Sequence, residues 1–412
     1  MKVAMLTIGS RGDVQPFVAL GVGLREAGHE VTLATGDAFE AFVAERGLRF
    51  AALEVGPLER LQSPEGKAAL TGKKALATLK EVASTYRRIL EGELEASRGA
   101  DAVVYHPKAL GGYHIAEALN IQAFLAHPVP MFSPTCDFPT PVLPVTSLGG
   151  PLNRLSYKAF LHIATAPFHR TINRWRHETL GLPPRRLLAS ELELRGEPVV
   201  NLVGCSPHVV PPPADWGTST IMTGYWFLDG AGDWRPPAHL AAFLEDGPPP
   251  VYVGFGSLGG WTSSEVVEAA LAALERSGKR GVFATGRVPS RVPDNVCVIE
   301  SAPHEWLFPR LAAVVHHGGA GTTAEGLRAG KPTVICPTTM NDQMFWGQRV
   351  RDLGVGPEPV PQKKLTAERL LRAIRSATED GGIRERAAVL GERIRAERGV
   401  ARAVEVIGVA AP

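Results

Sequence analysis

The stretch His316-His317-Gly318-Gly319-Ala320-Gly321-Thr322-Thr323 decides the fold, because it follows the apolar run 312–315 and leads into the helix-like segment 324–329. The first amides of a helix lack intrahelical partners and carry the positive end of its dipole, so a strand, a turn of small residues and a helix start make an anion site. Glycine leaves room for the anion, and threonine can cap or donate. We call this stretch the cradle. A tight turn without a ligand is the alternative.

The cradle differs from two common phosphate motifs. No Gly-Lys-Ser/Thr closes it, so it is not a P-loop, and it lies far from the N-terminus, where a dinucleotide fingerprint is usual. Side chains alternate along a strand, so His316 and His317 point in opposite directions at the end of one. This argues against a metal pair, and we expect one histidine, His316, to face the anion.

Length and composition indicate a two-domain globular protein. The 412 residues exceed one ordinary core, and 44% hydrophobic with 21% charged residues is typical of a globular chain. A net charge of +2 gives no reason to expect nucleic acid. The 4 cysteines are scattered, without zinc or disulfide-scaffold spacing. Residues 1–8 are too short for a signal peptide and no apolar run reaches the roughly 18 residues that span a bilayer, so we expect a cytoplasmic protein.

The N-terminal half reads as alternating strands and helices. An apolar strand at 2–8, a loop at 9–13, a helix at 17–27 and a strand at 31–34 form one βαβ unit. Further strands are expected at 102–105, 122–125 and 199–202. This repetition predicts a doubly wound parallel sheet.

A second unit of the same kind follows a proline-rich segment with little periodicity. The sequence predicts an N-terminal domain at 1–220, a linker at 221–249, a C-terminal domain at 250–385 and a helix at 386–412 that packs back on the first domain. In this second half of the chain, strands are expected at 251–255, 281–284, 296–299, 312–315 and 333–336. Helices are expected at 264–277, 365–378 and 383–409.

Two further segments of the N-terminal half have an unusual composition. Residues 135–151 are rich in proline and small residues, and we interpret them as a substrate loop over the carboxyl edge of the sheet. Residues 153–179 are basic and amphipathic, which indicates either a solvated helix pair or a helix on a membrane surface.

Three loops fall at the carboxyl ends of predicted strands: 9–13, 254–257 and 316–343. Open α/β sheets bind ligands at that edge. Because the loops belong to both predicted domains, we expect one ligand cleft between the domains.

The motifs at these loops resemble those of nucleotide-sugar glycosyltransferases with two Rossmann-like domains, the GT-B type in the UDP-glycosyltransferase family. The likeness is greatest to sterol 3-beta-glucosyltransferases and bacterial antibiotic glycosyltransferases. Thr7-Ile8-Gly9-Ser10-Arg11-Gly12-Asp13-Val14-Gln15-Pro16 resembles their N-terminal signature, and the cradle followed by Asn341-Asp342-Gln343 resembles their donor signature. The resemblance covers nearly the whole chain and implies a GT-B fold, an α/β pair of Rossmann-like domains facing across a cleft.

The resemblance implies that Asp13 is the catalytic base that takes the proton of the acceptor hydroxyl. A carboxylate near pKa 4 is a weak base, so it needs partial desolvation or a late proton transfer. The alternative from the residues alone is an aspartate that caps the following helix. Asp342 is a reserve candidate for the base.

The same resemblance implies the residues that bind the nucleotide sugar. Backbone amides of Gly318, Gly319, Ala320, Gly321 and Thr322, with the side chains of His316, Thr322 and Ser257, are expected to stabilise the leaving diphosphate. Asp342 and Gln343 are expected on the sugar hydroxyls, and the backbone at Ser301 and Ala302 on the base, with Ser10 and Gly12 also at the donor. No Asp-x-Asp occurs in the chain, so we expect no metal and no other cofactor.

The acceptor site is less determined. Residues near His106, Phe132, Phe138 and 143–148 could line an apolar pocket, although such spacings also suit a plain core.

The expected reaction is an inverting, metal-independent transfer of a hexose, glucose from UDP-glucose, to a hydroxyl of a lipophilic acceptor such as a sterol, triterpenoid or polyketide. A dTDP-deoxysugar donor, a non-catalytic sugar-nucleotide-binding protein and a UDP-sugar epimerase remain alternatives. Peripheral membrane contact is also open.

Overall fold

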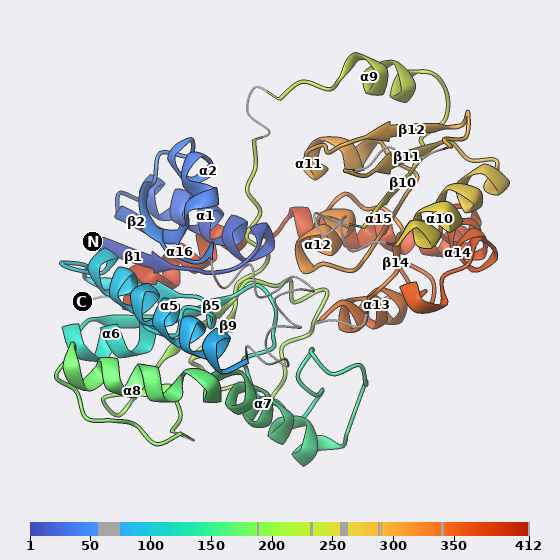
Figure 1. Cartoon of the computed structure of the whole chain (residues 1–412). Helices are drawn as coiled ribbons and strands as arrows, with labels where there is room; N and C mark the ends of the chain where they lie inside the picture. Colours follow the sequence, from blue (N-terminus) through green and yellow to red (C-terminus); the bar gives the residue numbers. More distant parts are fainter. Residues whose placement is uncertain are drawn as a thin grey trace.

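The computed structural model describes residues 1–56, 75–187, 189–230, 234–255, 263–286, 289, 291–338 and 342–410. Two parallel β-sheets flanked by helices form two units (Figure 1). The predicted fold class, two doubly wound α/β units, is therefore confirmed.

The first sheet has seven parallel strands in the described residues, in the order β3-β2-β1-β4-β5-β8-β9. The strands are β1 Lys2–Leu6, β2 Glu30–Gly36, β3 Arg49–Leu53, β4 Ala102–Tyr105, β5 Gln122–His127, β8 Val200–Val203 and β9 Thr220–Met222. A short antiparallel pair, β6 Glu193–Leu194 and β7 Glu197–Pro198, lies outside it. Both faces of the sheet are covered, which explains the nearly continuous apolar runs of its central strands.

Helices pack on both faces of this sheet. One face carries α5 Ala75–Ala96, α6 Gly112–Leu119 and α8 His169–Glu178, whose residues Leu90, Ile115 and Trp175 share a buried cluster. The other face carries α1 Arg11–Glu26, and Phe17 of α1 lies in a second buried cluster. The remaining helices of this unit are α2 Glu40–Ala44 and α7 Gly150–Thr165.

The second sheet has five parallel strands in the described part of the chain, in the order β12-β11-β10-β13-β14. The strands are β10 Val251–Gly254, β11 Gly281–Ala284, β12 Val296–Ile299, β13 Ala313–His316 and β14 Thr333–Ile335. The helices of this half are α9 Ala238–Glu245, α10 Ser264–Ser277, α11 His304–Leu307, α12 Ala320–Arg328, α13 Gln343–Asp352, α14 Ala367–Glu379 and α15 Gly381–Arg395.

The last predicted helix, 383–409, is divided in the structure into α15 and α16 Gly399–Ala410. The break lets the chain cross back to the first unit, where Ala403 and Ile407 of α16 join the cluster of Phe17. Gly399 lies so close to that unit that a Cβ on it would meet the carbonyl oxygen of Tyr225 at 2.2 Å. The prediction of a single long helix is therefore wrong, because the backbone must turn where Gly399 closely contacts the first unit.

The two units share an apolar contact surface. Val209 and Tyr225 of the first half belong to the same buried cluster as Leu327 and Trp346 of the second. The guanidinium of Arg349 also donates from Nη2 to the Val209 carbonyl oxygen at 2.7 Å. The two units are thus held together by packing and hydrogen bonds as well as by the connecting chain.

Two predicted boundaries near the sites shift in the structure. The predicted loop 9–13 is shorter, because α1 begins at Arg11, and the helix after the cradle begins at Ala320 instead of 324. In both cases glycines lie in the first turn of the helix, where their poor helix propensity hid the start from pattern reading. No helix in the described part of the chain is long and apolar enough to cross a membrane.

Candidate functional site

The predicted base, Asp13, lies in the first turn of α1, directly after strand β1. Its carboxylate Oδ2 accepts from the backbone N–H of Ser10 at 2.8 Å and from the Ser10 hydroxyl at 3.1 Å. A Cβ at Gly9, whose φ is +139°, would stand 2.2 Å from Oδ2. Glycine is therefore required before Ser10 so that the Asp13 carboxylate can fold back over its own turn.

The other oxygen of Asp13 faces the loop after β4. Lys108 Nζ donates to Oδ1 at 2.7 Å, and His106 Nε2 lies 3.7 Å from the same oxygen. Burial alone raises the pKa of Asp13, but the charge of Lys108 and the hydrogen bonds outweigh it, so the pKa lies below its usual value. Asp13 is thus both a helix cap and a carboxylate that stays ionised at neutral pH.

Lys108 is a residue that the sequence reasoning missed. Its backbone N–H donates to His106 Nδ1 at 3.1 Å, which holds the His106 ring against the backbone of the same loop. Burial lowers the pKa of His106 to about 3, so its ring is neutral at pH 7 and Lys108 carries the positive charge. The available signal was position, since Lys108 follows a buried strand at the ligand-binding edge of the sheet.

The cradle has the geometry of a helix N-terminus open to a ligand. Gly319 is the N-cap of α12, so the amides of Ala320, Gly321 and Thr322 have no intrahelical acceptor. A Cβ at Gly321 would meet nothing within 4 Å, so the first turn has free space in front of it. Gly318 has a φ of +93°, and a Cβ there would come within 3.0 Å of the Gln343 carbonyl oxygen. The glycines thus serve different purposes, clearance at Gly321 and backbone turning at Gly318.

The two adjacent histidines have different surroundings. His316 is fully buried at the end of β13, and its Nδ1 accepts from the Gly318 N–H at 3.0 Å. Its Nε2 has no hydrogen-bond partner, and burial holds its pKa well below the usual value. The His317 ring lies beside the N-cap of α12, because a Cβ at Gly319 would meet His317 Nε2 at 2.7 Å. Both histidines are therefore neutral at pH 7, and His317, to which the sequence analysis gave no role, lies beside the start of α12.

Asp342 and Gln343 begin α13 beside the cradle. Asp342 is the N-cap of α13, and its Oδ2 accepts from Trp346 Nε1 at 2.6 Å. Gln343 Oε1 accepts from both the amide and the hydroxyl of Thr338, at 2.7 and 2.8 Å. The carbonyl end of the Gln343 amide is thus engaged by the protein, which leaves its NH₂ group for a ligand.

The two halves place Asp13 and Asp342 within electrostatic reach of each other. Burial raises the pKa of Asp342, the hydrogen bond from Trp346 opposes this, and the charge of Asp13 raises it further. In the same way burial lowers the pKa of His304 in α11 to about 4, and the charge of Arg11 in α1 adds to the shift. The first turn of α1 therefore faces α11 and α13 across the space between the units.

A pocket of about 590 Å³ lies along the helix that follows the cradle, between residues 229–230 and helices α11 and α12. Its lining includes Trp306, Glu325 and Arg328. Burial raises the pKa of Glu325 to about 7, and Arg328 Nη1 is buried without a hydrogen-bond partner. The pocket thus offers a flat aromatic ring, a carboxylate acceptor and an unsatisfied donor.

The remaining predicted donor residues lie around these groups. Ser10 and Gly12 are exposed in the turn that holds Asp13, and Ser301 and Ala302 lie between β12 and α11. Ser257 and Asn341 fall outside the described residues. In the described part of the chain, no group of three or more His, Cys, Asp or Glu residues lies together as a metal site would require.

The predicted acceptor residues Phe132 and Phe138 make two separate aromatic contacts. The ring centroid of Phe132 is 6.4 Å from that of His106, and that of Phe138 is 5.6 Å from Phe345 in α13. Phe138 in the predicted substrate loop therefore contacts the second unit, whereas Phe132, which precedes that loop, contacts the His106 ring beside Asp13.

Comparisons with known proteins agree with this arrangement. Residues 3–135 match the glycosyltransferase family 28 N-terminal domain, and residues 284–406 match the erythromycin biosynthesis protein CIII-like C-terminal domain. The sterol 3-beta-glucosyltransferase of Emericella nidulans is 38% identical over 427 aligned residues, which cover 99% of this chain and 30% of that protein. The chain thus spans about a third of the length of the curated relatives it matches.

Solved structures share the fold over the full length. The glycosyltransferase of kitacinnamycin superimposes with a TM-score of 0.74 at 22% identity, covering 100% of this chain and 99% of that one. The Streptomyces sp. SF2575 glycosyltransferase SsfS6, complexed with thymidine diphosphate, gives a TM-score of 0.65 at 21% identity and covers 100% of both chains.

Two Rossmann-like units that face each other define the GT-B fold class. The chain belongs to the GT-B glycosyltransferases, with a family 28 type N-terminal domain and an erythromycin CIII-like C-terminal domain.

Proposed function

We propose that the protein transfers glucose from UDP-glucose to a hydroxyl of a sterol or a similar lipophilic acceptor, with inversion and without a metal. The observation that carries the proposal is that the Asp13 carboxylate lies within electrostatic reach of Asp342, at the start of helix α13, and that Gln343 in the first turn of α13 lies beside Gly318 of the cradle. The name of the 38% identical relative, a sterol 3-beta-glucosyltransferase, supports the choice of acceptor and sugar.

The reaction needs one proton acceptor. The acceptor oxygen attacks the anomeric carbon, its O–H proton passes to Asp13, and the bond from that carbon to the diphosphate oxygen breaks. A single displacement of this kind inverts the anomeric centre. Since the pKa of Asp13 is low, the proton moves late, after the attacking oxygen has become acidic by bonding to carbon.

The leaving diphosphate is stabilised by the cradle in this proposal. Three unpaired amides at the positive end of α12 face the developing negative charge, and they need no reorganisation. The neutral ring of His317 beside Gly319 can donate a further hydrogen bond. These groups supply the stabilisation that a metal ion provides in other transferases.

The pocket next to α12 suits the nucleoside end of the donor. Glu325 lies five residues after Ala320, which corresponds to about 7.5 Å along the helix axis. This spacing matches the separation of a ribose from a diphosphate held at the helix start. The Glu325 carboxylate would accept from the ribose hydroxyls, and the backbone at Ser301 and Ala302 before α11 would contact the base.

Mass spectrometry of products from UDP-glucose and a panel of sterols and macrolides, with and without EDTA, tests the proposal. A sterol hexoside with a β-anomeric proton in NMR, formed equally in EDTA, is the expected product. Loss of product in EDTA would refute metal independence. Absence of any product, with UDP still bound in calorimetry, would indicate a binding protein instead.

A dTDP-sugar is the second candidate donor. It is favoured by the thymidine diphosphate bound to SsfS6, which shares the fold over the full chain. The same assay with dTDP-glucose separates the two donors by their kcat/KM. The variant Glu325→Gln should raise the KM of either donor about tenfold, because a charged acceptor is lost, whereas Glu392→Gln on the exposed face of α15 should not.

A further inference from the structure

Helix α7 and the loop before it expose an unusual amount of apolar surface. Leu152 is 56%, Leu155 55% and Ile163 73% exposed, and Val145 and Leu148 in the loop are 40% and 41% exposed. Nine large hydrophobic residues are exposed in the described part of the chain, and five of them lie in this short segment. Single exposed apolar residues are ordinary, but a concentration of this kind marks an interaction surface.

These side chains lie on one face of the helix. The spacing of Leu152, Leu155, Ala159 and Ile163, three or four residues each, aligns them along α7, and Leu148 lies in the loop just before the helix. We call this stripe the α7 face. In Figure 1 the helix and its preceding loop project at the lower edge of the molecule.

The α7 face does not result from a poorly packed helix. The opposite side of α7 is buried: Asn153 donates to the Cys136 carbonyl oxygen at 2.8 Å, and Tyr157 donates to that of Phe138 at 3.3 Å. The helix is therefore fixed on the substrate loop through one side, and the apolar stripe on the other side remains uncovered.

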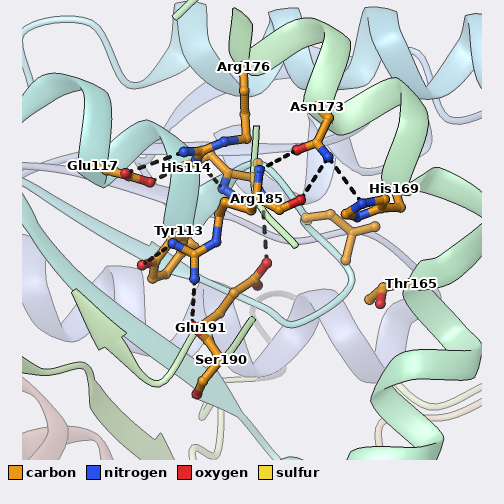
Figure 2. A network of polar contacts seen from close by, with 12 residues as sticks. Tyr113, His114, Glu117, Thr165, His169, Asn173, Arg176, Arg185, Ser190 and Glu191 are labelled. Atoms are coloured by element: carbon orange, nitrogen blue, oxygen red, sulfur yellow. Dashed lines mark hydrogen bonds and ion pairs between the residues drawn. The ribbon is translucent and has the colours of Figure 1, made fainter. Parts of the chain in front are cut away.

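The helix that follows, α8, is anchored by a buried ion pair. Arg176 is 1% exposed and donates from Nη1 to Glu117 at 2.8 Å and to His114 Nδ1 at 2.8 Å (Figure 2). Asn173 donates to the Arg185 carbonyl oxygen at 2.9 Å in the same network. The α7 face thus adjoins a firmly held helix.

The charge around the α7 face is positive. Residues 138–177 contain no Asp or Glu, whereas Arg154, Lys158, Arg170 and Arg174 all lie exposed in this tract. Arg154 pairs with Asp215 only over 3.9 Å and is 55% exposed. Exposed apolar side chains flanked by cations match the surface of an anionic bilayer, where each cation adds about fivefold in affinity.

The inner side of α7 leads to the predicted base. The ring centroid of Phe160 in α7 is 6.0 Å from Phe132, and Phe132 is 6.4 Å from His106. His106 Nε2 in turn lies 3.7 Å from Asp13 Oδ1. Two aromatic contacts therefore connect the helix that carries the α7 face with the carboxylate.

We propose that the α7 face docks on an anionic lipid bilayer and that the acceptor passes from the bilayer along Phe160 and Phe132 to Asp13. The docking itself stands independently, and the passage of the acceptor rests on the function proposed above.

Sedimentation of the full chain with vesicles tests the docking without any donor. Vesicles of phosphatidylcholine with added phosphatidylglycerol should bind the protein, and binding should weaken with salt and with pure phosphatidylcholine. The double variant Leu155→Ser/Ile163→Ser should weaken binding at least tenfold. Losing the two cations in Arg154→Gln/Lys158→Gln should weaken it about 25-fold.

Matched variants on other surfaces control for non-specific effects. Val389→Ser/Val409→Ser removes exposed apolar side chains from α15 and α16, and Arg384→Gln/Arg393→Gln removes exposed cations from α15. Both should bind vesicles as the unaltered chain does. Unchanged thermal midpoints would show that all variants fold.

Equal binding to both kinds of vesicle, no binding, or equal losses in the matched variants would overturn the docking. A dimer in analytical ultracentrifugation that Leu155→Ser/Ile163→Ser dissociates would also overturn it, since a second copy would then cover the face. Vesicle binding without any glycosylated product, when UDP-glucose and a sterol in the vesicles are also supplied, would leave the docking intact and refute the proposed function. If docked protein glycosylates a detergent-dissolved acceptor as fast as one in the vesicle, the proposed passage is wrong.

Discussion

The variant Asp13→Asn separates the two roles that the structure gives to this residue, helix cap and proton acceptor. Asparagine keeps the shape and one acceptor oxygen, but it cannot take a proton from the acceptor hydroxyl. Loss of a general base lowers kcat by about 10²- to 10⁴-fold, or about 3 to 5 kcal/mol in the barrier. The loss should appear in kcat, because the donor is bound mainly by the other half of the protein.

The cost in stability should be much smaller. The charge of Asp13 is lost at the N-terminus of α1 and beside Lys108, which is 51% exposed, so solvent screens the ion pair. Together these terms are worth about 1 to 2 kcal/mol at pH 7. Since the pKa of Asp13 is lowered on folding, this contribution exists above its unfolded value of 3.8 and is lost as the pH falls below that. The difference between variant and unaltered chain should therefore shrink in acid.

The variant Asp380→Asn is the matched control. Asp380 caps α15, and its Oδ1 accepts from the Ile383 N–H at 3.1 Å. Since asparagine caps a helix about as well as aspartate, only the charge at the helix N-terminus is lost, and the variant should lose about 0.5 kcal/mol of stability and none of the rate. Single-turnover kinetics and urea unfolding of both variants, with UDP affinity by calorimetry, give the comparison.

A rate for Asp13→Asn within tenfold of the unaltered chain would refute the base assignment and leave Asp13 as a cap. In that event Asp342→Asn decides the matter. If Asp342 only binds the sugar, its variant raises donor KM. If Asp342 is the base, its variant lowers kcat at saturating donor.

The structure predicts the effects of three further substitutions on stability or donor binding. Gly318→Ala places a Cβ against a backbone carbonyl at a φ of +93°, so it should cost about 2 to 4 kcal/mol in urea unfolding and weaken UDP binding in calorimetry. Arg176→Met leaves its carboxylate partner unpaired and should cost about 3 kcal/mol, whereas Arg174→Met, at a side chain 77% exposed, should stay within about 0.5 kcal/mol. Glu93 is buried with a pKa of about 8, above its unfolded value of 4.5, so stability should fall as the pH rises from about 5 to 8. Glu93→Gln should remove this fall and stabilise by up to about 4 kcal/mol at pH 8, while Glu95→Gln, 74% exposed on the same helix, should not.

Most strands of the two sheets and about half of the helices were predictable, because their periodicities are strong and both sheets are covered on two faces. Neither the outer strands β3 and β9 nor helix α5 was predicted from the sequence. The predicted helix 264–277 and strands 281–284 and 296–299 coincide with α10, β11 and β12. The break between α15 and α16 was not predictable, since Gly399 is required by a contact with Tyr225, which lies far away in sequence. A local pattern holds no information about such a contact.

The site was predictable in its backbone and less so in its side chains. The glycines at 318, 319 and 321 indicate a helix N-terminus with free space in front of it, and in the structure α12 begins at Ala320. Lys108 escaped notice because a lysine after a strand is common, and only the fold brings it to 2.7 Å from Asp13. Which of the two rings, His316 or His317, is buried also depends on where the strand ends, because a shift of one residue turns the other side chain inward.

Asp13 and Asp342 have pKa values displaced in opposite directions, and this difference argues for different roles. Asp13 is held ionised by Lys108 and by hydrogen bonds from Ser10, so at neutral pH it always has a free charge to receive a proton. Asp342 is raised by burial and by the charge of Asp13, so a proton arriving at Asp13 relieves that repulsion. In the proposed reaction, transfer of one proton from the acceptor to Asp13 would therefore lower the pKa of Asp342 and stabilise its ionised form as the sugar develops positive charge. Two carboxylates facing each other in this way can share the reaction, one as the proton acceptor and the other as a counter-charge to the sugar.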